Sequence, residues 1–174
     1  MAGNVVLIGF SGTGKSYAGR AAARLLNWDF VDTDDLLVKR FSMPIGDYFR
    51  LHGESVFRDA ESEAIAIVCK RTRNVIAVGG GAVVRDVNRS LLRDGNLVVR
   101  LNAPINTILE RLAGSPGAEE RPMLSGVDPR GRIAKLLDER EPIYQQSDAT
   151  IDTENRSLDE VAREIKRLVQ MRWP

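Results

Sequence analysis

The sequence predicts an α/β fold, in which five strands form an open, mostly parallel sheet with helices on both faces. Short runs rich in Val and Ile alternate with longer segments of helical character along the whole chain. The strand candidates are mostly apolar, as expected when helices cover both faces of a parallel sheet. The chain shows no internal repeat and no linker, so we expect residues 1–174 to form a single domain.

The first four elements alternate strand and helix. Asn4–Ile8 is apolar after its first residue and predicts a buried strand. Lys15–Leu26 is rich in Ala, Arg and Leu, which favour helix. Asp29–Val31 is a short strand candidate. Thr33–Arg40 predicts a helix, with acidic residues in its first turn where they complement the helix dipole.

Two helices and a strand are expected next. Pro44 suits the first position of a short helix that runs to about Leu51. Glu54–Lys70 predicts a longer helix, because its apolar residues recur at spacings of three and four. Val75–Val78 predicts a strand that leads directly into three glycines.

The second half of the chain repeats this alternation. Asp86–Arg93 predicts a helix, and Leu97–Leu101 predicts the next strand. Asn102 as N-cap and Pro104 in the first turn predict another helix, running to about residue 112. Ala113–Val127 holds three glycines and two prolines without periodicity, so we expect a loop.

Three elements complete the predicted fold. Asp128-Pro129 is typical of a helix start, and this helix should reach about Gln145. Ala149–Ile151 predicts the last strand. A capping box at Ser157–Glu160 then predicts the start of the C-terminal helix.

The composition narrows the classes of function. The chain has 25 Lys and Arg against 24 Asp and Glu, and this balance argues against a general nucleic-acid binder. A single cysteine, Cys69, excludes an internal disulfide, and a single histidine, His52, argues against a His-based metal site or a Ser-His-Asp triad. The apolar run Val5–Ile8 is too short to span a membrane or act as a signal. We therefore expect a cytoplasmic monomer that binds small molecules and contacts neither nucleic acid nor membrane.

Residues 9–16, Gly-Phe-Ser-Gly-Thr-Gly-Lys-Ser, match the phosphate-loop pattern G-x-x-x-x-G-K-[ST] in full. The motif lies between a predicted strand and a predicted helix, as the pattern requires. Its glycines let successive backbone N–H groups converge on phosphate oxygens. Lys15 would contact the β- and γ-phosphates, and the Ser16 hydroxyl would bind Mg²⁺. The sequence therefore predicts a nucleoside triphosphate site with Mg²⁺.

Three aspartates follow the second predicted strand: Asp32, Asp34 and Asp35. Ligands of parallel α/β sheets bind at the carboxyl ends of the strands, so these acids should face the same crevice as the phosphate loop. One could belong to the metal shell, and another could accept a hydrogen bond from an attacking hydroxyl. The alternative is that they only cap the next helix, and for Asp35 we favour that alternative.

An arginine and a glycine run are further candidates. Glu54 and Glu61 lie four residues before and three after Arg58 on one helix face, and could lock its guanidinium group. A solvated network of ion pairs is the alternative. Gly79, Gly80 and Gly81 suggest close approach of a ligand or another chain segment to the backbone, with a plain tight turn as the alternative.

Together these motifs carry a family resemblance. Shikimate kinases have the same features in the same order and spacing: the phosphate loop, Asp32-x-Asp34, Phe57-Arg58, the three glycines, Arg121-Pro122 and Arg140-x-Pro142-x-Tyr144. The resemblance covers essentially the whole chain. It implies the nucleoside monophosphate kinase fold with strand order 2-3-1-4-5, a substrate-binding region at about residues 33–61 and a mobile lid at about residues 113–127. It also implies transfer of the γ-phosphate of ATP to the 3-hydroxyl of shikimate, on the route to aromatic amino acids.

The resemblance further implies roles on the acceptor side. Asp34 matches the residue that binds the ring hydroxyls and orients the 3-hydroxyl. Arg58 and Arg140 match the pair that grips the shikimate carboxylate, and the backbone of Gly79–Gly81 would close the pocket. Asp32 matches an acid that binds Mg²⁺ through water and could assist deprotonation.

On the nucleotide side, the resemblance implies contacts from the loop residues Gly12, Thr13, Gly14, Lys15, Ser16 and Tyr17. Arg121 matches the lid arginine that moves onto the phosphates. Arg111 matches a residue that packs on the adenine, and Arg156 lies in the other adenine-contacting segment. Tyr17 departs from the family, which often has a small hydroxyl residue there, and a frequent proline near Arg156 is missing.

Two other functions remain open at this point. A gluconate kinase of the same fold would also bind a polyhydroxy carboxylate, but the three glycines and Arg140-x-Pro142-x-Tyr144 favour shikimate. A catalytically silent homologue should have lost an acid or an arginine of the site, whereas this chain keeps all of those named above.

Overall fold

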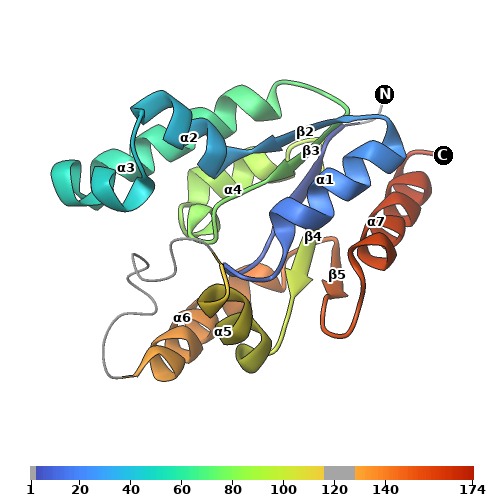
Figure 1. Ribbon diagram of the computed structural model, residues 1–174. Helices are drawn as coiled ribbons and strands as arrows, with labels where there is room; N and C mark the ends of the chain where they lie inside the picture. The colour runs from blue at the N-terminus through green and yellow to red at the C-terminus, as the bar shows by residue number, and fades with distance from the viewer. Residues whose placement is uncertain (1–2, 116–127) are drawn as a thin grey trace.

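The computed structural model describes residues 3–115 and 128–174. Within them, five parallel strands form one sheet in the order β2-β3-β1-β4-β5 (Figure 1). The strands are β1 (Val5–Ile8), β2 (Asp29–Asp32), β3 (Asn74–Ala77), β4 (Leu97–Asn102) and β5 (Ala149–Asp152). The predicted fold class and strand order are therefore confirmed.

Helices cover both faces of the sheet. On one face, α1 (Lys15–Leu26) and α7 (Leu158–Arg172) pack side by side in front of the strands (Figure 1). On the other face lie α3 (Ile45–Cys69), α4 (Asp86–Arg93) and α6 (Pro129–Tyr144). Successive residues of a strand point to opposite faces, so Val5 and Leu7 contribute to the first core while Val6 and Ile8 contribute to the second.

Two smaller apolar clusters support the segments at the carboxyl end of the sheet. α2 (Thr33–Phe41) packs on α3 through Leu37 and Phe57. α5 (Ile105–Ala113) packs on α6, and Phe10 of the phosphate loop is buried in the same cluster as Ile108 and Ile133. The phosphate loop is thus anchored by a side chain that points away from the ligand-facing backbone.

Helix boundaries differ from the predicted ones in the region before β3. Pro44 is the N-cap of α3 instead of its first residue, and the two expected helices form one element. The element is kinked at Gly53, where φ is 80° and ψ is 167°. Only glycine adopts such a conformation readily, so the predicted break is present as a kink within a longer helix.

The prediction that Asn102 caps a helix is wrong. Asn102 is the last residue of β4 and pairs with Asp152 of β5, and its carbonyl accepts a hydrogen bond from Thr153 N at 2.8 Å. The β4–β5 ladder therefore keeps Asn102 extended, and Pro104 becomes the N-cap of α5. A short 3₁₀ helix, η1 (Ala82–Val84), follows the three glycines and was not predicted.

Two predicted helix starts are confirmed. Asp128 caps α6 by accepting a hydrogen bond from Gly131 N at 2.8 Å. Ser157 and Glu160 form a reciprocal capping box at the start of α7. Across residues 3–115 and 128–174, none of the helices has the length and apolar character needed to cross a bilayer.

Packing of α7 on the sheet should dominate the stability of the β4–β5 side. Ile165 of α7 is 0% exposed and lies in the same core as Val5 and Leu7, whereas Ile67 on α3 is 57% exposed. We predict that Ile165→Ala lowers the free energy of unfolding by about 2–5 kcal/mol, because it removes buried methyl groups and leaves a cavity. Ile67→Ala is the matched control and should cost less than about 1 kcal/mol. Urea unfolding of both variants measures the difference, and similar losses would contradict the assigned packing.

Candidate active site

The phosphate loop connects β1 to α1 and has the backbone geometry of an anion cradle. Gly9, Gly12 and Gly14 have φ values of 139°, 85° and 91°, which L side chains rarely adopt. Gly14 is the N-cap of α1 and gives no side-chain cap, so the first N–H groups of the helix remain directed into the loop. The helix dipole adds positive potential at the same point.

Lys15 lies inside this cradle. Its Nζ donates hydrogen bonds to Gly9 O and Phe10 O, both at 2.9 Å. Burial lowers the pKa of Lys15 to about 8, against the opposing effects of Asp34 and Asp32. The carbonyl oxygens of the phosphate loop therefore hold the Lys15 amine in place. When a nucleotide binds, the amine can replace these hydrogen bonds with hydrogen bonds to phosphate oxygens.

Asp32 joins the phosphate loop to the end of β2. Its Oδ2 accepts a hydrogen bond from Ser16 Oγ at 2.5 Å, while its Oδ1 accepts one from Asp34 N at 3.0 Å and caps α2. Asp32 therefore caps the helix and also contacts the predicted metal ligand Ser16. A hydroxyl and a carboxylate are the hard oxygen ligands that Mg²⁺ prefers, so the pair fits that ion.

Asp34 lies deeper in the site. Desolvation raises the pKa of Asp34 to about 6; the charge of Asp32 adds to the rise and that of Lys15 opposes it. Asp35, by contrast, is exposed in the first turn of α2 and forms an ion pair with Arg20 at 2.8 Å. The structural role favoured for Asp35 fits this position.

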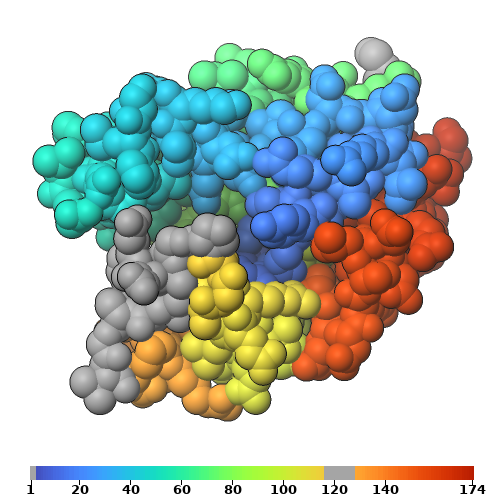
Figure 2. Space-filling model, in the orientation of Figure 1, coloured from blue at the N-terminus to red at the C-terminus, as the bar shows by residue number. Residues whose placement is uncertain are grey.

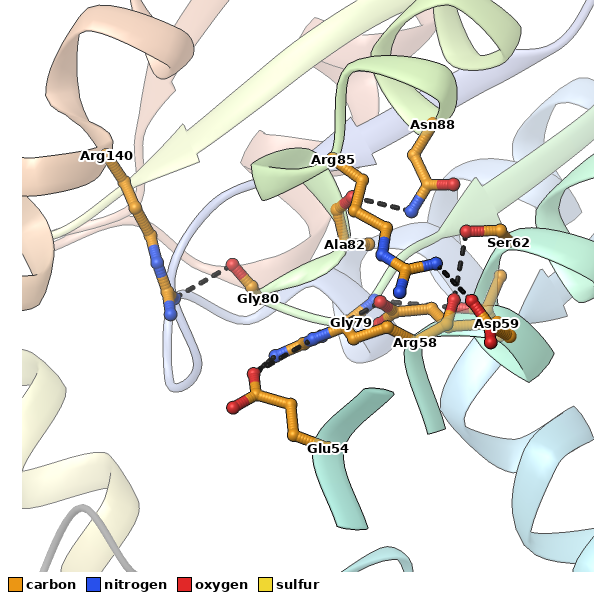
Figure 3. Close-up of polar contacts among 12 residues, drawn as sticks. Glu54, Arg58, Asp59, Ser62, Gly79, Gly80, Ala82, Arg85, Asn88 and Arg140 are labelled. Carbon is orange, nitrogen blue, oxygen red and sulfur yellow. Dashed lines mark hydrogen bonds and ion pairs between the residues drawn. The ribbon is translucent and has the colours of Figure 1, made fainter. Parts of the chain in front are cut away.

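Arg58 is held as its spacing from two acids predicts. Nη2 donates to Glu54 Oε1 at 3.2 Å (Figure 3). Nη1 donates to Glu61 Oε2 at 2.8 Å. Glu61 is only 1% exposed, and its desolvation raises its pKa while the charge of Arg58 opposes that rise. The guanidinium group also lies over the Phe57 ring, 5.4 Å from the centroid. One orientation is therefore selected by charge and by packing.

The three glycines are explained by close approach of other groups. A Cβ atom on Gly79 would lie 2.7 Å from Asp34 Oδ1, and one on Gly81 would lie 2.6 Å from Arg58 Nη2. A Cβ atom on Gly80 would lie 3.1 Å from Ser11 N of the phosphate loop. The glycine segment therefore allows side chains of two helices and a backbone loop to meet, which a plain turn would not require.

Arg140 approaches the same segment from α6. Its Nη1 donates to Gly80 O at 2.9 Å (Figure 3). Tyr144 Oη donates to the same oxygen at 3.2 Å. The Arg140 guanidinium also lies 5.5 Å from the Phe10 ring centroid. Arg58 and Arg140, 82 residues apart in the sequence, thus converge on one strand-end segment.

A cleft of about 810 Å³ runs along the phosphate loop. In Figure 2 the dark blue loop segment lies recessed between α2–α3 in cyan and the start of α7 in red. Predicted residues line the cleft on both sides: Gly12, Thr13, Gly14, Lys15, Ser16, Tyr17, Asp32, Asp34, Gly79, Gly80, Arg111 and Arg156. Arg58, Gly81 and Arg140 are not in its lining and adjoin it through Gly79 and Gly80.

The nucleotide end of the cleft contains a residue that sequence reasoning missed. Thr153, just after β5, accepts a hydrogen bond from Arg111 Nη1 at 2.9 Å through its Oγ1. The same Oγ1 lies 3.2 Å from Thr13 O, and Thr153 O accepts from Arg111 Nη2 at 2.9 Å. Thr153 therefore connects the predicted adenine-side arginine to the phosphate loop. No local motif marks it, because its partners come from β4, α5 and the loop.

Arg121 and most of the predicted lid, residues 113–127, lie outside the described residues. Of that segment, Ala113 ends α5, and Gly114 and Ser115 line the cleft.

A family model described as shikimate kinase matches residues 11–170. The chain belongs to the shikimate kinase family. Shikimate kinase of Moorella thermoacetica is 47% identical to it over 170 residues, which cover 98% of this chain and 96% of that protein. A solved shikimate kinase from Acinetobacter baumannii, in complex with shikimate, superposes with a TM-score of 0.92 at 30% identity, covering 99% of this chain and 96% of that chain.

The gluconate kinase alternative finds support in fold alone. A gluconokinase from Sinorhizobium meliloti superposes with a TM-score of 0.60 at 21% identity, covering 98% of this chain and 95% of that chain. This likeness confirms a common architecture for the two enzymes. The sequence likeness that assigns the family is to shikimate kinases.

We expect the raised pKa of Asp34 to lower the stability of the folded protein at neutral pH. Asp34 titrates near 3.8 when solvated and near 6 in the folded protein, so charging it costs more in the folded state. The penalty is complete above about pH 6 and absent below about pH 4. We predict that Asp34→Asn raises the free energy of unfolding by about 1–2 kcal/mol at pH 8, and that the gain disappears toward pH 4.

Urea unfolding at several pH values, without added substrates, measures this gain. Asp35→Asn is the matched control, because that side chain is exposed and paired with Arg20; it should show no such gain. A stability gain that is the same at pH 4 and pH 8 would contradict the desolvation argument.

Proposed function

We propose that this chain transfers the γ-phosphate of ATP to the 3-hydroxyl of shikimate, with the nucleotide on the phosphate loop and the acceptor between Asp34, Arg58 and Arg140. One observation carries the proposal. A Cβ atom on Gly80 would lie 3.1 Å from Ser11 N of the phosphate loop, and Gly80 O accepts a hydrogen bond from Arg140, so the glycine segment lies between the proposed nucleotide and acceptor sites. Membership of the shikimate kinase family supports the choice of acceptor.

On the nucleotide side, the backbone N–H groups of residues 12–16 would bind the β-phosphate. Lys15 would bridge the β- and γ-phosphates, since its Nζ already lies within the loop. Arg111, held by Thr153, and Arg156 would border the adenine at the other end of the cleft. Positioning of this kind is the main source of rate in phosphoryl transfer.

Ser16 and Asp32 would hold Mg²⁺, Ser16 directly and Asp32 through water. Bound there, the ion would neutralise charge on the transferring phosphates. Proteins usually bind Mg²⁺ through one or two side chains together with substrate phosphates, so this small donor set is sufficient. The hydrogen bond from Ser16 to Asp32 keeps both oxygens on the same side of the loop.

On the acceptor side, Arg58 and Arg140 would bind the shikimate carboxylate by charge-assisted hydrogen bonds. Asp34 would accept hydrogen bonds from the ring hydroxyls. With a pKa of about 6, it is largely ionised at neutral pH yet a stronger base than an ordinary aspartate. It can therefore orient the 3-hydroxyl and accept its proton as the bond to phosphorus forms.

Three further predictions complete the proposal. Arg121 would move onto the phosphates when the lid closes, adding a cation and excluding water. The cytoplasmic location and the monomeric state stay predictions from the sequence.

A coupled assay of ADP formation tests the function directly. Shikimate, quinate and gluconate are offered side by side with ATP and Mg²⁺. We expect turnover with shikimate that depends on Mg²⁺, and little with gluconate. Equal or better turnover with gluconate would overturn the assigned acceptor.

We predict that Lys15→Met abolishes turnover and leaves the protein folded. The variant removes the ligand-facing charge but keeps the length of the side chain. Lys70→Met is the control, because Lys70 is exposed at the end of α3, before β3 begins. ADP formation and thermal unfolding are measured for both variants. Normal rates in Lys15→Met would exclude the proposed phosphate site.

We predict that Asp34→Asn lowers kcat by at least about 100-fold, because a positioning and proton-accepting group is lost. The KM for ATP should change little, since Asp34 serves the acceptor. Steady-state kinetics with each substrate varied in turn measure both effects. A variant with normal turnover and weak ATP binding would mean that the roles of Asp32 and Asp34 are reversed.

A further inference from the structure

A charged residue of the sheet contacts the helix that carries Arg140. Arg100 belongs to β4, where it pairs in register with Ile8 of β1 and Thr150 of β5. Its side chain is only 11% exposed. A guanidinium group in this position must be held by specific partners, because burying an unpaired charge is costly.

One hydrogen bond of Arg100 goes to Asn102 Oδ1 of β4 at 3.2 Å, and the charged partner lies on the last turns of α6. Nη1 and Nη2 of Arg100 donate to Glu141 Oε1 and Oε2 at 2.9 and 2.7 Å, a bidentate ion pair. The guanidinium group also lies 5.1 Å from the centroid of the Tyr144 ring. These hydrogen bonds lower the pKa of Glu141. Arg100 therefore contacts α6 through Glu141 and Tyr144, which lie in the turn that follows Arg140.

The same turn carries the acceptor arginine. Arg140 immediately precedes Glu141, and it is four residues before Tyr144, so Arg140 and Tyr144 share a helix face. Both donate to Gly80 O, at 2.9 and 3.2 Å. The contacts of Arg100 and those of Gly80 thus meet on a single helical turn.

The hydrogen bonding within this turn of α6 is incomplete. Pro142 lies inside α6 and has no N–H group, so one hydrogen bond of the helix is missing there. A helix interrupted in this way bends readily unless outside contacts set its direction. Arg100 from β4 and Gly80 from the loop after β3 supply such contacts on either side.

We propose that Arg100 is a positioning residue for the acceptor site: by binding Glu141 and covering Tyr144, it fixes the turn of α6 that aims Arg140 at the shikimate carboxylate. This inference rests on the proposed function of Arg140. Deleting both partners should change stability little, since Glu141 is 40% exposed. Deleting Glu141 alone leaves the 11% exposed Arg100 side chain without its carboxylate and should cost more. The effect of the pair on binding is larger, because a displacement of about 1 Å at a binding group costs much of its interaction.

The experiment uses the full chain and steady-state kinetics with each substrate varied. Arg100→Met keeps an unbranched apolar side chain but removes the guanidinium group that lies over Tyr144. We expect the KM for shikimate to rise about tenfold, with kcat and the KM for ATP unchanged within about twofold. Arg167→Met is the matched control. Arg167 makes a comparable bidentate pair with Glu164 on α7, and its loss should leave both KM values unchanged.

A second variant removes the pair from its other side. Glu141→Gln should raise the KM for shikimate to a similar extent, and the double variant should add little, because both changes delete the Arg100–Glu141 ion pair. Arg100→Met also removes the longer hydrogen bond to Asn102 Oδ1 at 3.2 Å. Arg100→Lys should recover part of the loss, since a lysine restores the charge without the bidentate geometry. If Arg100→Met does not fold, Glu141→Gln and Arg100→Lys still decide the question.

Arg140→Met separates this inference from the proposed function. If Arg140→Met raises the KM for shikimate but Arg100→Met and Glu141→Gln leave it unchanged, the positioning role is wrong and the proposed function stands. If Arg140→Met has a normal KM for shikimate, the role of Arg140 itself is wrong. Equal rises in both KM values for Arg100→Met would indicate a general disturbance of the sheet and would also overturn the positioning role.

Discussion

The common direction of the five strands is the constraint on which the site depends. Because all strands are parallel, their carboxyl ends meet at one edge, and the segments that follow them face one another. The phosphate loop follows β1, Asp32 ends β2, the glycines follow β3 and Thr153 follows β5. Since β1 lies between β3 and β4, the phosphate loop is central and every other polar group reaches it from one side or the other. A change of strand order would separate the glycine segment from the loop and place the acceptor site elsewhere.

Much of this arrangement follows from local signals in the sequence. These features depend on neighbours within one turn or one loop. They include the alternation of strands and helices, the phosphate loop and the helix caps at Asp128 and Ser157. The ion pairs of Arg58 with acids three and four residues away are a further example. What the sequence could not predict depends on register between distant elements. Asn102 is held extended by pairing with β5, and Thr153 acquires its role only when β5 lies beside the loop. The Arg100–Glu141 pair joins a strand and a helix 41 residues apart. Arg100 belongs to no recognised motif, and Glu141 occupies an unspecified position of Arg140-x-Pro142-x-Tyr144.

Burial of charged groups in the site lowers the stability of the folded protein. Lys15 and Asp34 are both desolvated, and burial shifts the pKa of each toward neutrality. Their mutual attraction offsets part of that cost without removing it. Glu61 is buried beside Arg58 and is subject to the same opposition between desolvation and pairing. Such residues cluster at functional sites because groups poised near neutrality can exchange protons and partners as substrates bind. Among residues 3–115 and 128–174, the charged residues with the smallest exposed fraction are Lys15 and Glu61, and both belong to the candidate site.

The lysine and arginine side chains of the site are held in place by protein groups in the absence of substrate. The chain has almost no net charge, so it cannot attract anions through a general basic surface. Lys15 is held by two carbonyls, Arg58 by two carboxylates, Arg111 by Thr153 and Arg140 by Gly80. A mobile lysine or arginine loses considerable side-chain entropy when a ligand orders it. Here the side chains are already ordered in the folded protein, so ligand binding costs less entropy. Two anionic substrates can therefore be bound by a few oriented groups instead of a broad basic surface. Orientation then depends on the residues that support these cations. For Arg140, the proposed support is the ion pair of Arg100 with the adjacent Glu141, in the turn that contains Pro142.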